Sequence, residues 1–373
     1  MLTSDFDYNL PAELIAQTPA SPRDCSRLMV VDKMQKKISH KHFQDITKYI
    51  SNNDLVVWNN SKVFKARLKG TIMLDESSDD ISDKREQRMK LSDMILNAPE
   101  VEIFLLRPAE NFGVWSVLAK PAKKLRLGMK IVFAHDFFCS VLLKQDDGTL
   151  LVEFTEDDMS IRAKANKYGE VPTPPYIKKP IAGIGSCLED DYQTIYAREE
   201  GSVAAPTAGF HFTPKLVEQL KVKGVEFAEI TLHVGLGTFQ PIKTDNTDDH
   251  KMHSEWVSLT SSNADLINQA KKDGRRVIAV GTTTARTLEG VASLSAGLPA
   301  LSPYTGDINI FIIPGYKFKI IDALITNFHL PKSTLLMMIS AFIGSEKFTL
   351  DCYQKAIKAN YRFYSFGDAM LIK

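Results

Sequence analysis

The sequence predicts a mixed α/β (α+β) protein in which a small antiparallel β-barrel or sandwich accompanies a larger α/β region. Between residues 101 and 154, short strand-like runs are broken by Gly, Pro or Asp, a spacing typical of small antiparallel β structures. From residue 191 onward, helical stretches alternate with strands, as they do in α/β proteins. The chain has 373 residues, of which 44% are hydrophobic and 24% charged, enough for a substantial core and two domains.

The first strands are expected on either side of a short loop. Residues 54–60 (DLVVWNN) form an apolar run ending in turn-forming asparagines, and residues 63–68 resume it with alternating charges. Residues 75–99 are too rich in charge to supply core, so we expect an exposed, mobile insertion. The barrel strands are then expected at residues 101–106, 115–118, 130–133, 138–143 and 150–154.

One helix of the α/β region carries signals at both ends. Thr213 suits its N-cap, Pro214 its first turn and Gly224 its C-terminal cap. Leu216, Val217 and Leu220 form its apolar stripe. Helical spacing recurs at residues 262–272 and 353–364, and further strands are expected at 227–233 and 276–280.

Charge and cysteine content exclude several classes of protein. The 46 Lys and Arg nearly balance the 45 Asp and Glu, giving a net charge of +1, so any RNA contact requires a local basic patch. The four cysteines form no CxxC pair, which argues against a zinc ribbon or a disulfide framework. The N-terminal residues show no signal-peptide pattern, and no run of about 18 apolar residues suggests a membrane span. We therefore expect a cytoplasmic enzyme.

Two glycine-containing clusters are candidates for ligand loops. Residues 201–212 (GSVAAPTAGFHF) open directly onto the capped helix, so their backbone is able to approach a ligand. An ordinary turn with a satisfied His211 explains the same pattern. Residues 231–241 (TLHVGLGTFQP) resemble a strand end followed by a ligand loop, but their GLG matches neither nucleotide fingerprint. A tight turn explains this pattern equally well.

Three further segments concentrate polar groups. Residues 248–255 (DDHKMHSE) contain an HxxH pair, but this spacing lacks the HExxH signature, so we expect no metal site. Residues 280–286 (VGTTTAR) and 326–331 (TNFHLP) follow strands, and α/β sites gather at carboxyl ends of strands. The alternative is structural: the threonines cap a helix and His329 packs beneath Pro331.

With these segments, the chain resembles the S-adenosylmethionine:tRNA ribosyltransferase-isomerase family of queuosine biosynthesis, and the resemblance extends almost from one end of the chain to the other. The charged stretch between residues 74 and 99 departs from the short hairpin expected there, which bears on a local domain boundary. The strongest motifs are AAPTAGFHF from Ala204, TLHVGLGTFQP from Thr231, DHKMHSE from Asp249, VGTTTAR from Val280 and DALITNFHLPKSTL from Asp322. Weaker ones are Asp5-Phe6 with Leu10-Pro11, Asn59-Asn60 with Ala66-Arg67-Leu68, Lys120-Pro121-Ala122, and PTPPYI at 172–177.

The resemblance implies a smaller β-barrel inserted into a larger α/β domain. On this basis we expect a discontinuous large domain at residues 1–70 and 165–373, and a barrel at 71–164 that carries the charged insertion at about 75–99. It also implies the reaction. The ribosyl part of S-adenosylmethionine is transferred to 7-aminomethyl-7-deazaguanine (preQ1) at the wobble position of a tRNA anticodon and isomerised to epoxyqueuosine, with release of adenine and methionine. S-adenosylmethionine is then a co-substrate, no cofactor is needed, and we expect a monomer.

Site residues follow from the motifs. For proton transfer we expect His211, His233, His253 and His329, because neutral imidazole accepts protons near pH 7. For substrate binding we expect Thr207, Gly209, Phe210, Gly235, Gly237, Thr238, Phe239, Gln240, Thr282, Thr283, Arg286 and Asn327, with Arg286 on a phosphate or on the methionine carboxylate. For tRNA we expect the basic run Lys120, Lys123, Lys124 and Arg126, for which a solvated lysine face is an equal alternative.

Two other functions remain open. A metal-dependent hydrolase using His211, His233, His250 and His253 predicts bound zinc or iron and loss of activity with a chelator. A tRNA-binding protein without catalysis explains a basic patch but not several polar loops.

Overall fold

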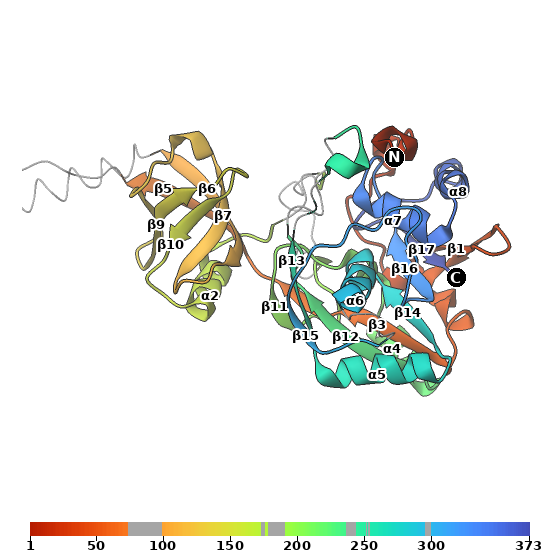
Figure 1. The fold of residues 1–373 in the computed structure, drawn as a ribbon. Helices are drawn as coiled ribbons and strands as arrows, with labels where there is room; N and C mark the ends of the chain where they lie inside the picture. Colours follow the sequence, from red (N-terminus) through yellow and green to blue (C-terminus); the bar gives the residue numbers. More distant parts are fainter. Residues whose placement is uncertain are drawn as a thin grey trace, which may run out of the picture. The chain divides into compact units, whose positions relative to one another are not determined.

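The computed structural model describes residues 1–73, 99–172, 176–177, 191–235, 244–250, 252, 254–294 and 300–373. The chain forms two compact units, one made of Met1–Lys62 with Thr173–Lys373 and the other of Val63–Pro172. The smaller unit contains a closed antiparallel barrel, and the larger one a mixed sheet with helices (Figure 1). The predicted fold class is confirmed.

The smaller unit extends beyond the range 71–164 expected from the sequence. It begins at Val63 and ends at Pro172, because the first barrel strand starts at Arg67 and a helix that packs on the barrel ends at Tyr168. Residues 75–98 of the predicted charged insertion (75–99) lie outside the described residues.

Six strands close the barrel in the order β10-β7-β6-β5-β8-β9. The buried positions alternate along β5, as required when one face of a strand lines a barrel interior. Gly70 on this strand allows close packing, since a Cβ there would lie 2.7 Å from the Phe133 ring. The strands are β5 Arg67–Met73, β6 Glu100–Pro108, β7 Val114–Lys120, β8 Lys130–Ala134, β9 Phe137–Lys144 and β10 Leu150–Glu153.

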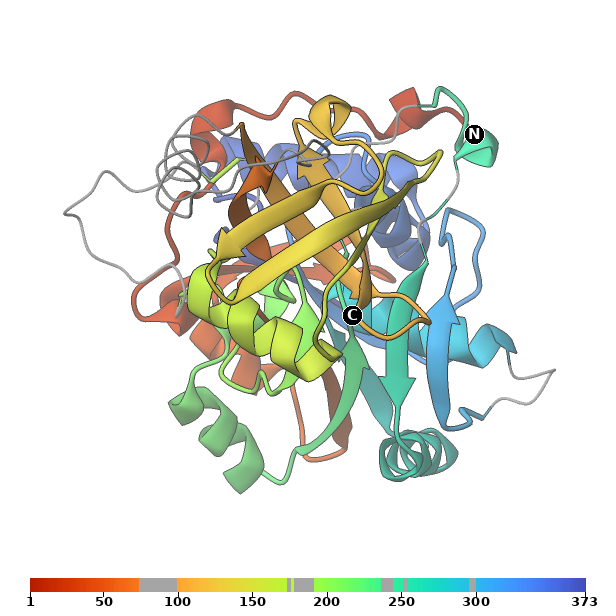
Figure 2. The same cartoon turned by 90° about the vertical axis from the view of Figure 1, so that its left-hand side faces the viewer.

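Helix α2 (Asp158–Tyr168) lies beside the barrel strands (Figure 2). The side chain of Asp157 caps its first turn by accepting the Ser160 N–H. Ile161 and Ala165 are buried, and the Trp115 Nε1–H donates to Asp158 at 3.1 Å. This helix was not predicted from the sequence, because its apolar stripe is short.

Nine strands form the sheet of the larger unit, in the order β15-β13-β12-β3-β14-β16-β17-β1-β2. The four strands at its centre, β12, β3, β14 and β16, run parallel to one another. Their carboxyl ends therefore meet at one edge. The strands are β1 Arg27–Asp32, β2 Lys37–His42, β3 Asp54–Asn59, β12 Glu226–Leu232, β13 Glu255–Leu259, β14 Arg276–Val280, β15 Tyr304–Ile308, β16 Ala323–Asn327 and β17 Ala369–Ile372. A separate pair consists of β4 Ser61–Val63 and β11 Glu199–Ser202.

Helices cover both faces of this sheet. On one face, Leu55 and Val57 of β3 belong to a core shared with α5 Ser261–Lys272, α6 Thr282–Leu294, α7 Thr334–Ile343 and α8 Glu346–Lys358. On the other face, Val56 and Trp58 pack with α4 Pro214–Val222 and the 3-10 helix η4 Phe43–Lys48. All of β3 is buried, which explains its continuous apolar sequence.

Most predicted elements of the larger unit are confirmed. Thr213 caps α4 by accepting the Leu216 N–H, and Gly224 has a left-handed φ of +89° after the helix. Two expectations were wrong. Residues 63–68 form no single strand, since β4 ends at Val63 and β5 begins at Arg67. The helix expected over 353–364 ends at Lys358, because Asn360 turns the chain with a φ of +54°. Among the described residues, no helix is long and apolar enough to cross a membrane.

A buried carboxylate on α6 anchors the segment that leads into β16. Glu289 is 0% exposed. Its Oε1 accepts the N–H groups of Ile320 and Ile321 at 2.9 and 3.1 Å, while its Oε2 accepts the Lys319 N–H at 2.8 Å and the Tyr316 hydroxyl at 3.1 Å. These bonds satisfy both the charge and four donors, so Glu289 fixes where β16 starts.

We therefore expect Glu289→Gln to lower the free energy of unfolding by about 2–4 kcal/mol. The amide NH₂ would replace an oxygen that now accepts hydrogen bonds from two donors, and both donors would lose their acceptor. Urea unfolding followed by circular dichroism measures the change. The control is Glu218→Gln on the exposed face of α4. Equal midpoints for wild type and Glu289→Gln would contradict the anchoring role.

Candidate functional site

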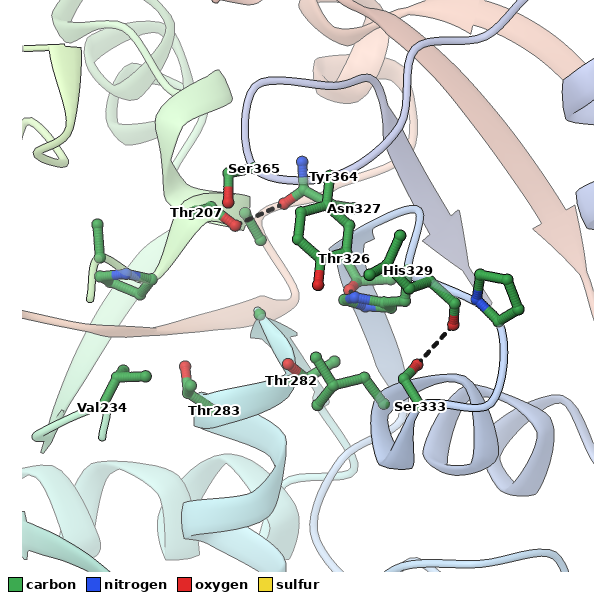
Figure 3. Close-up of a pocket in the computed structure, with 17 residues that line it drawn as sticks. Thr207, Val234, Thr282, Thr283, Thr326, Asn327, His329, Ser333, Tyr364 and Ser365 are labelled. Carbon is green, nitrogen blue, oxygen red and sulfur yellow. Dashed lines mark hydrogen bonds between the residues drawn. The ribbon is translucent and has the colours of Figure 1, made fainter. Parts of the chain in front are cut away.

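A pocket opens where the parallel strands of the larger unit end. The space between its lining atoms is about 760 Å³, which includes its open mouth. Figure 3 shows side chains from several loops around this space. The lining residues are Ala205, Pro206, Thr207, Ala208, Val234, Gly281, Thr282, Thr283, Thr326, Asn327, His329, Leu330, Pro331, Ser333, Leu335, Tyr364 and Ser365.

The predicted segments converge at this pocket from distant parts of the chain. Residues 205–208 come from the first glycine-containing cluster, Val234 follows β12, residues 281–283 follow β14, and residues 326–331 follow β16. Because parallel strands end at one edge of a sheet, their following loops meet there. The sequence-based expectation that polar groups lie at these strand ends is confirmed.

Hydrogen bonds hold the first cluster against its neighbours. The Ser202 hydroxyl donates to the Ala204 carbonyl at 2.6 Å and accepts the Val234 N–H at 2.9 Å. The Thr207 hydroxyl donates to Asn327 Oδ1 at 3.2 Å (Figure 3). These contacts connect the cluster to the segment after β12 and to the end of β16.

His211 lies behind the pocket wall. Its Nδ1 lies 2.8 Å from the Ser26 hydroxyl, and its Nε2 accepts the Asn327 amide at 3.2 Å. The ring stacks on Phe43 and is buried. Burial lowers the pKa of His211 to about 3, so the imidazole is neutral at pH 7. His211 is not among the residues that line this pocket. Its hydrogen bond with the Asn327 amide orients Asn327, and the Asn327 oxygen in turn orients Thr207 by accepting a hydrogen bond from its hydroxyl.

His329 lines the pocket itself. Its Nε2 shares a hydrogen bond of 2.9 Å with the Thr326 hydroxyl. Its backbone is fixed on both sides, because its N–H donates to the Tyr353 hydroxyl at 3.2 Å and its carbonyl accepts the Tyr8 hydroxyl. Burial lowers the pKa of His329 to about 3. This ring is a neutral, positioned proton acceptor that faces the pocket.

His233 occupies an intermediate position. It directly precedes the pocket-lining Val234, and its ring stacks on Trp256 with centroids 4.7 Å apart. Gly201 allows the ring to lie close, because a Cβ at that glycine would be 2.2 Å from the imidazole. His233 itself does not line the pocket.

Arg286 makes a different contact from the one predicted. Its Nη1 forms a buried ion pair with Glu255, and the two side chains are only 6% and 5% exposed. Arg286 lies one turn beyond the pocket on α6 and is not among the lining residues. Its Nε and Nη2 have no hydrogen-bond partner among the described residues, and its predicted contact with a ligand carboxylate or phosphate stays a prediction.

Three other predicted substrate-binding residues lie away from the pocket lining. Gly209 packs against the Tyr196 hydroxyl, where a Cβ would approach to 2.0 Å. Phe210 packs with Tyr192 and Phe366 beside a smaller cavity of about 200 Å³. Gly235 follows Val234 but lines no described pocket. Outside the described residues are Gly237, Thr238, Phe239, Gln240 and His253.

Ser333, Tyr364 and Ser365 also line the pocket, and they were not predicted from the sequence. Ser333 caps α7 by accepting the Leu336 N–H at 3.2 Å, and the motif NFHLPKST carried that capping signal. Tyr364 has a φ of +76°, so it lies in a turn where helical spacing is no guide. No local pattern indicated that this turn returns to the strand ends.

The predicted basic run lies in the barrel unit. Lys120 ends β7, Lys123 and Lys124 belong to the 3-10 helix η5 (Ala122–Lys124), and Arg126 follows. All four side chains are exposed, and in the described part of the chain none forms an ion pair. Leu127 beside them is 62% exposed. This surface offers cations and an apolar contact, which suits a single-stranded nucleic acid.

Metal ligands are not gathered in the described residues, where no three His, Cys, Asp or Glu side chains are placed to hold an ion. His250 packs against the Phe311 ring with centroids 5.4 Å apart. The second histidine of the HxxH pair, His253, is not described.

We expect wild-type stability to fall as the pH decreases from about 6.5 towards 3, partly through His211. The unfolded chain binds a proton at this histidine below its ordinary pKa of 6.5, whereas the folded chain binds one only near 3. The free energy of unfolding should therefore fall by up to about 1.4 kcal/mol per pH unit in this window. His211→Gln should show a shallower slope, measured by urea unfolding between pH 7 and 4. Identical slopes in this variant and in the exposed control His42→Gln would refute the assignment.

We expect Arg286→Met to destabilise the protein by about 3–5 kcal/mol, because the Glu255 carboxylate would stay buried without the guanidinium. Replacing both partners, as in Glu255→Leu with Arg286→Met, should restore much of that loss. Unfolding midpoints of the two single variants and the double variant form the measurement. If Arg286→Met unfolded at the wild-type urea concentration, the ion pair would have no structural role.

Comparison with known proteins identifies the family. The family described as "Queuosine biosynthesis protein" matches residues 3–372. S-adenosylmethionine:tRNA ribosyltransferase-isomerases from Thermotoga petrophila and Carboxydothermus hydrogenoformans are 45% and 46% identical, each over 100% of both chains. A crystal structure of an S-adenosylmethionine tRNA ribosyltransferase from Thermotoga maritima is similar over 99% of this chain and 100% of that one, with 36% identity and a TM-score of 0.54. The resemblance seen in the motifs is confirmed, and the chain belongs to the queuosine biosynthesis protein family.

Proposed function

We propose that this chain transfers the ribosyl moiety of S-adenosylmethionine to preQ1 at the wobble position of a tRNA anticodon and isomerises it to epoxyqueuosine, releasing adenine and methionine. Family membership over residues 3–372 and full-length relatives named for this transferase-isomerase activity support the proposal. S-adenosylmethionine acts as co-substrate, and we expect no further cofactor, a cytoplasmic location and a monomeric enzyme.

One observation carries the proposal beyond family membership. Three of the segments with family motifs, at residues 204–212, 280–286 and 322–335, contribute side chains to a single pocket, and the motif that begins at Thr231 adds Val234. Thr207, Thr283 and His329 come from the three segments and face the same space (Figure 3).

The donor's own chemistry fits this lining. A sulfonium makes the neighbouring ribose C5′ hydrogens acidic, so a positioned neutral base is able to start the rearrangement. His329 is such a base, neutral at pH 7 and held by Thr326 and by its backbone bonds. A pKa of about 3 makes this imidazole a weak base, so proton transfer to it depends on the acidity that the sulfonium gives the C5′ hydrogens. Ala205, Val234 and Leu335 supply apolar walls that limit water.

His211 has a positioning role in this proposal. It receives the Asn327 amide, and Asn327 in turn accepts the Thr207 hydroxyl. Thr207 and Asn327 are then oriented for hydrogen bonds to the ribose or adenine. The direct catalytic roles expected of His233 and His253 stay predictions.

For the tRNA, we assign the exposed basic run of the barrel as a contact surface. Lys120, Lys123, Lys124 and Arg126 are free to meet phosphates, and an anticodon loop offers unpaired bases that stack on exposed apolar groups.

The test incubates the chelator-treated protein with S-adenosylmethionine and tRNA carrying preQ1, and follows adenine by chromatography and the nucleoside product by mass spectrometry. Adenine release should require both substrates and yield epoxyqueuosine. His329→Asn should lower turnover by about 100-fold or more, because it removes the proton acceptor.

The matched control is His135→Asn, which changes a histidine whose side chain is 85% exposed in the barrel unit. Absence of tRNA-dependent adenine release, with a relative active under the same conditions, would contradict the proposed function. Activity restored only by added zinc or iron would favour the metal-dependent hydrolase, and tRNA binding without turnover would favour the binding protein. Unchanged turnover in His329→Asn would remove that histidine as the base.

A further inference from the structure

The first turn of α6 lines the pocket, and no side chain among the described residues caps it. Its N-cap residue, Gly281, has a left-handed φ of +90° and accepts the Ala285 N–H with its carbonyl. The N–H groups of Thr282, Thr283 and Thr284 therefore have no carbonyl within the helix to accept them. They also form the positive end of the dipole of a helix that is 13 residues long.

A buried hydroxyl lies beside these N–H groups. Thr283 is only 7% exposed, lines the pocket and has no hydrogen-bond partner for its Oγ1 in the described part of the chain. Figure 3 shows the Thr283 oxygen pointing away from the helix into the pocket. The hydroxyls of Thr284 and Thr287, by contrast, donate to the carbonyls of Val280 and Thr283 at 2.7 and 3.0 Å. A buried hydroxyl without a partner is costly, so the position favours a ligand atom that accepts its proton.

Charge decides which kind of acceptor fits. The described lining of the pocket contains no Asp, Glu, Lys or Arg side chain, and the nearby Arg286 is paired with Glu255. The helix end is consequently the main positive feature of the lining, and it attracts anions while repelling cations. In S-adenosylmethionine the carboxylate is the anionic group, whereas the sulfonium and the ammonium are cations and adenine is neutral.

We propose that the first turn of α6, with the Thr283 hydroxyl, binds the carboxylate of the methionyl part of S-adenosylmethionine. This assignment rests on the proposed function, because it requires that the donor occupies this pocket. The sequence had offered Arg286 for this carboxylate or for a phosphate, and in the structure Arg286 is paired with Glu255. With the carboxylate held at α6, the sulfonium and ribose are left to the walls that carry Thr207, Asn327 and His329.

The test compares S-adenosylmethionine with its decarboxylated analogue, which keeps the sulfonium and lacks the carboxylate. Dissociation constants come from calorimetry on the full chain, and kcat and KM from tRNA-dependent adenine release. Wild type should bind S-adenosylmethionine at least tenfold more tightly than the analogue. Thr283→Val should weaken S-adenosylmethionine binding about tenfold while changing analogue binding little, and it should raise the KM for the donor more than it lowers kcat. Thr283→Ser, which restores the hydroxyl, should recover wild-type discrimination.

The matched control is Thr287→Val, which removes a buried hydroxyl from the same helix away from the pocket. Thermal unfolding of each variant separates folding defects from binding defects. If Thr283→Val fails to fold, the comparison of the two donors on wild type keeps the test valid, because equal affinities would overturn the assignment. Undiminished discrimination in a folded Thr283→Val would overturn the assignment. A higher KM for tRNA with unchanged donor affinity would overturn it in favour of an RNA phosphate. If wild type bound no S-adenosylmethionine at all, the proposed function itself would fail, a result distinct from the others.

Discussion

Parallel pairing of β14 with β3 on one side and β16 on the other is the constraint on which the pocket depends. Helices cover both faces of these strands, so their side chains must be apolar, and polar groups begin only where the strands end. The residues after Val280 and those around Asn327 therefore emerge side by side at one edge. Glu289 strengthens this arrangement. It lies on α6, the helix that follows β14, and its carboxylate accepts hydrogen bonds from the segment that leads into β16.

The described pocket lining carries hydroxyls, one amide and one imidazole, but no charged side chain. Arg286, one turn beyond the pocket on α6, is paired with Glu255. A ligand that brings its own charges then meets fixed dipoles in a surrounding of low polarity, where electrostatic interactions are strong. This setting suits a sulfonium donor, whose reactivity comes from its own charge while the protein supplies orientation and a neutral base.

The candidate site shows where sequence reasoning succeeds and where it stops. Thr207 and His211 belong to one short motif and to one 3-10 helix (Thr207–His211). Their contacts nevertheless differ, because Thr207 lines the pocket whereas His211 lies behind Asn327. The ion pair between Arg286 and Glu255 of β13 joins residues 31 positions apart, and no local pattern predicted it. Tyr364 was not predicted because the aromatic residues keep a helical spacing up to this position, whereas the helix itself ends before Asn360, which has a positive φ.

The sequence by itself determined the fold class, most strands, the capped helix α4 and the family, because these depend on local periodicity, end signals and contiguous motifs. It also placed Thr207, Thr282, Thr283, Asn327 and His329 among the candidates, and all five line the pocket. Only the tertiary structure decided which histidine faces that pocket, which arginine is paired and which threonine hydroxyl is left without a partner. Those choices depend on neighbours far away in the chain, and burial fixes the protonation and the hydrogen bonds of each side chain only after those neighbours have come together.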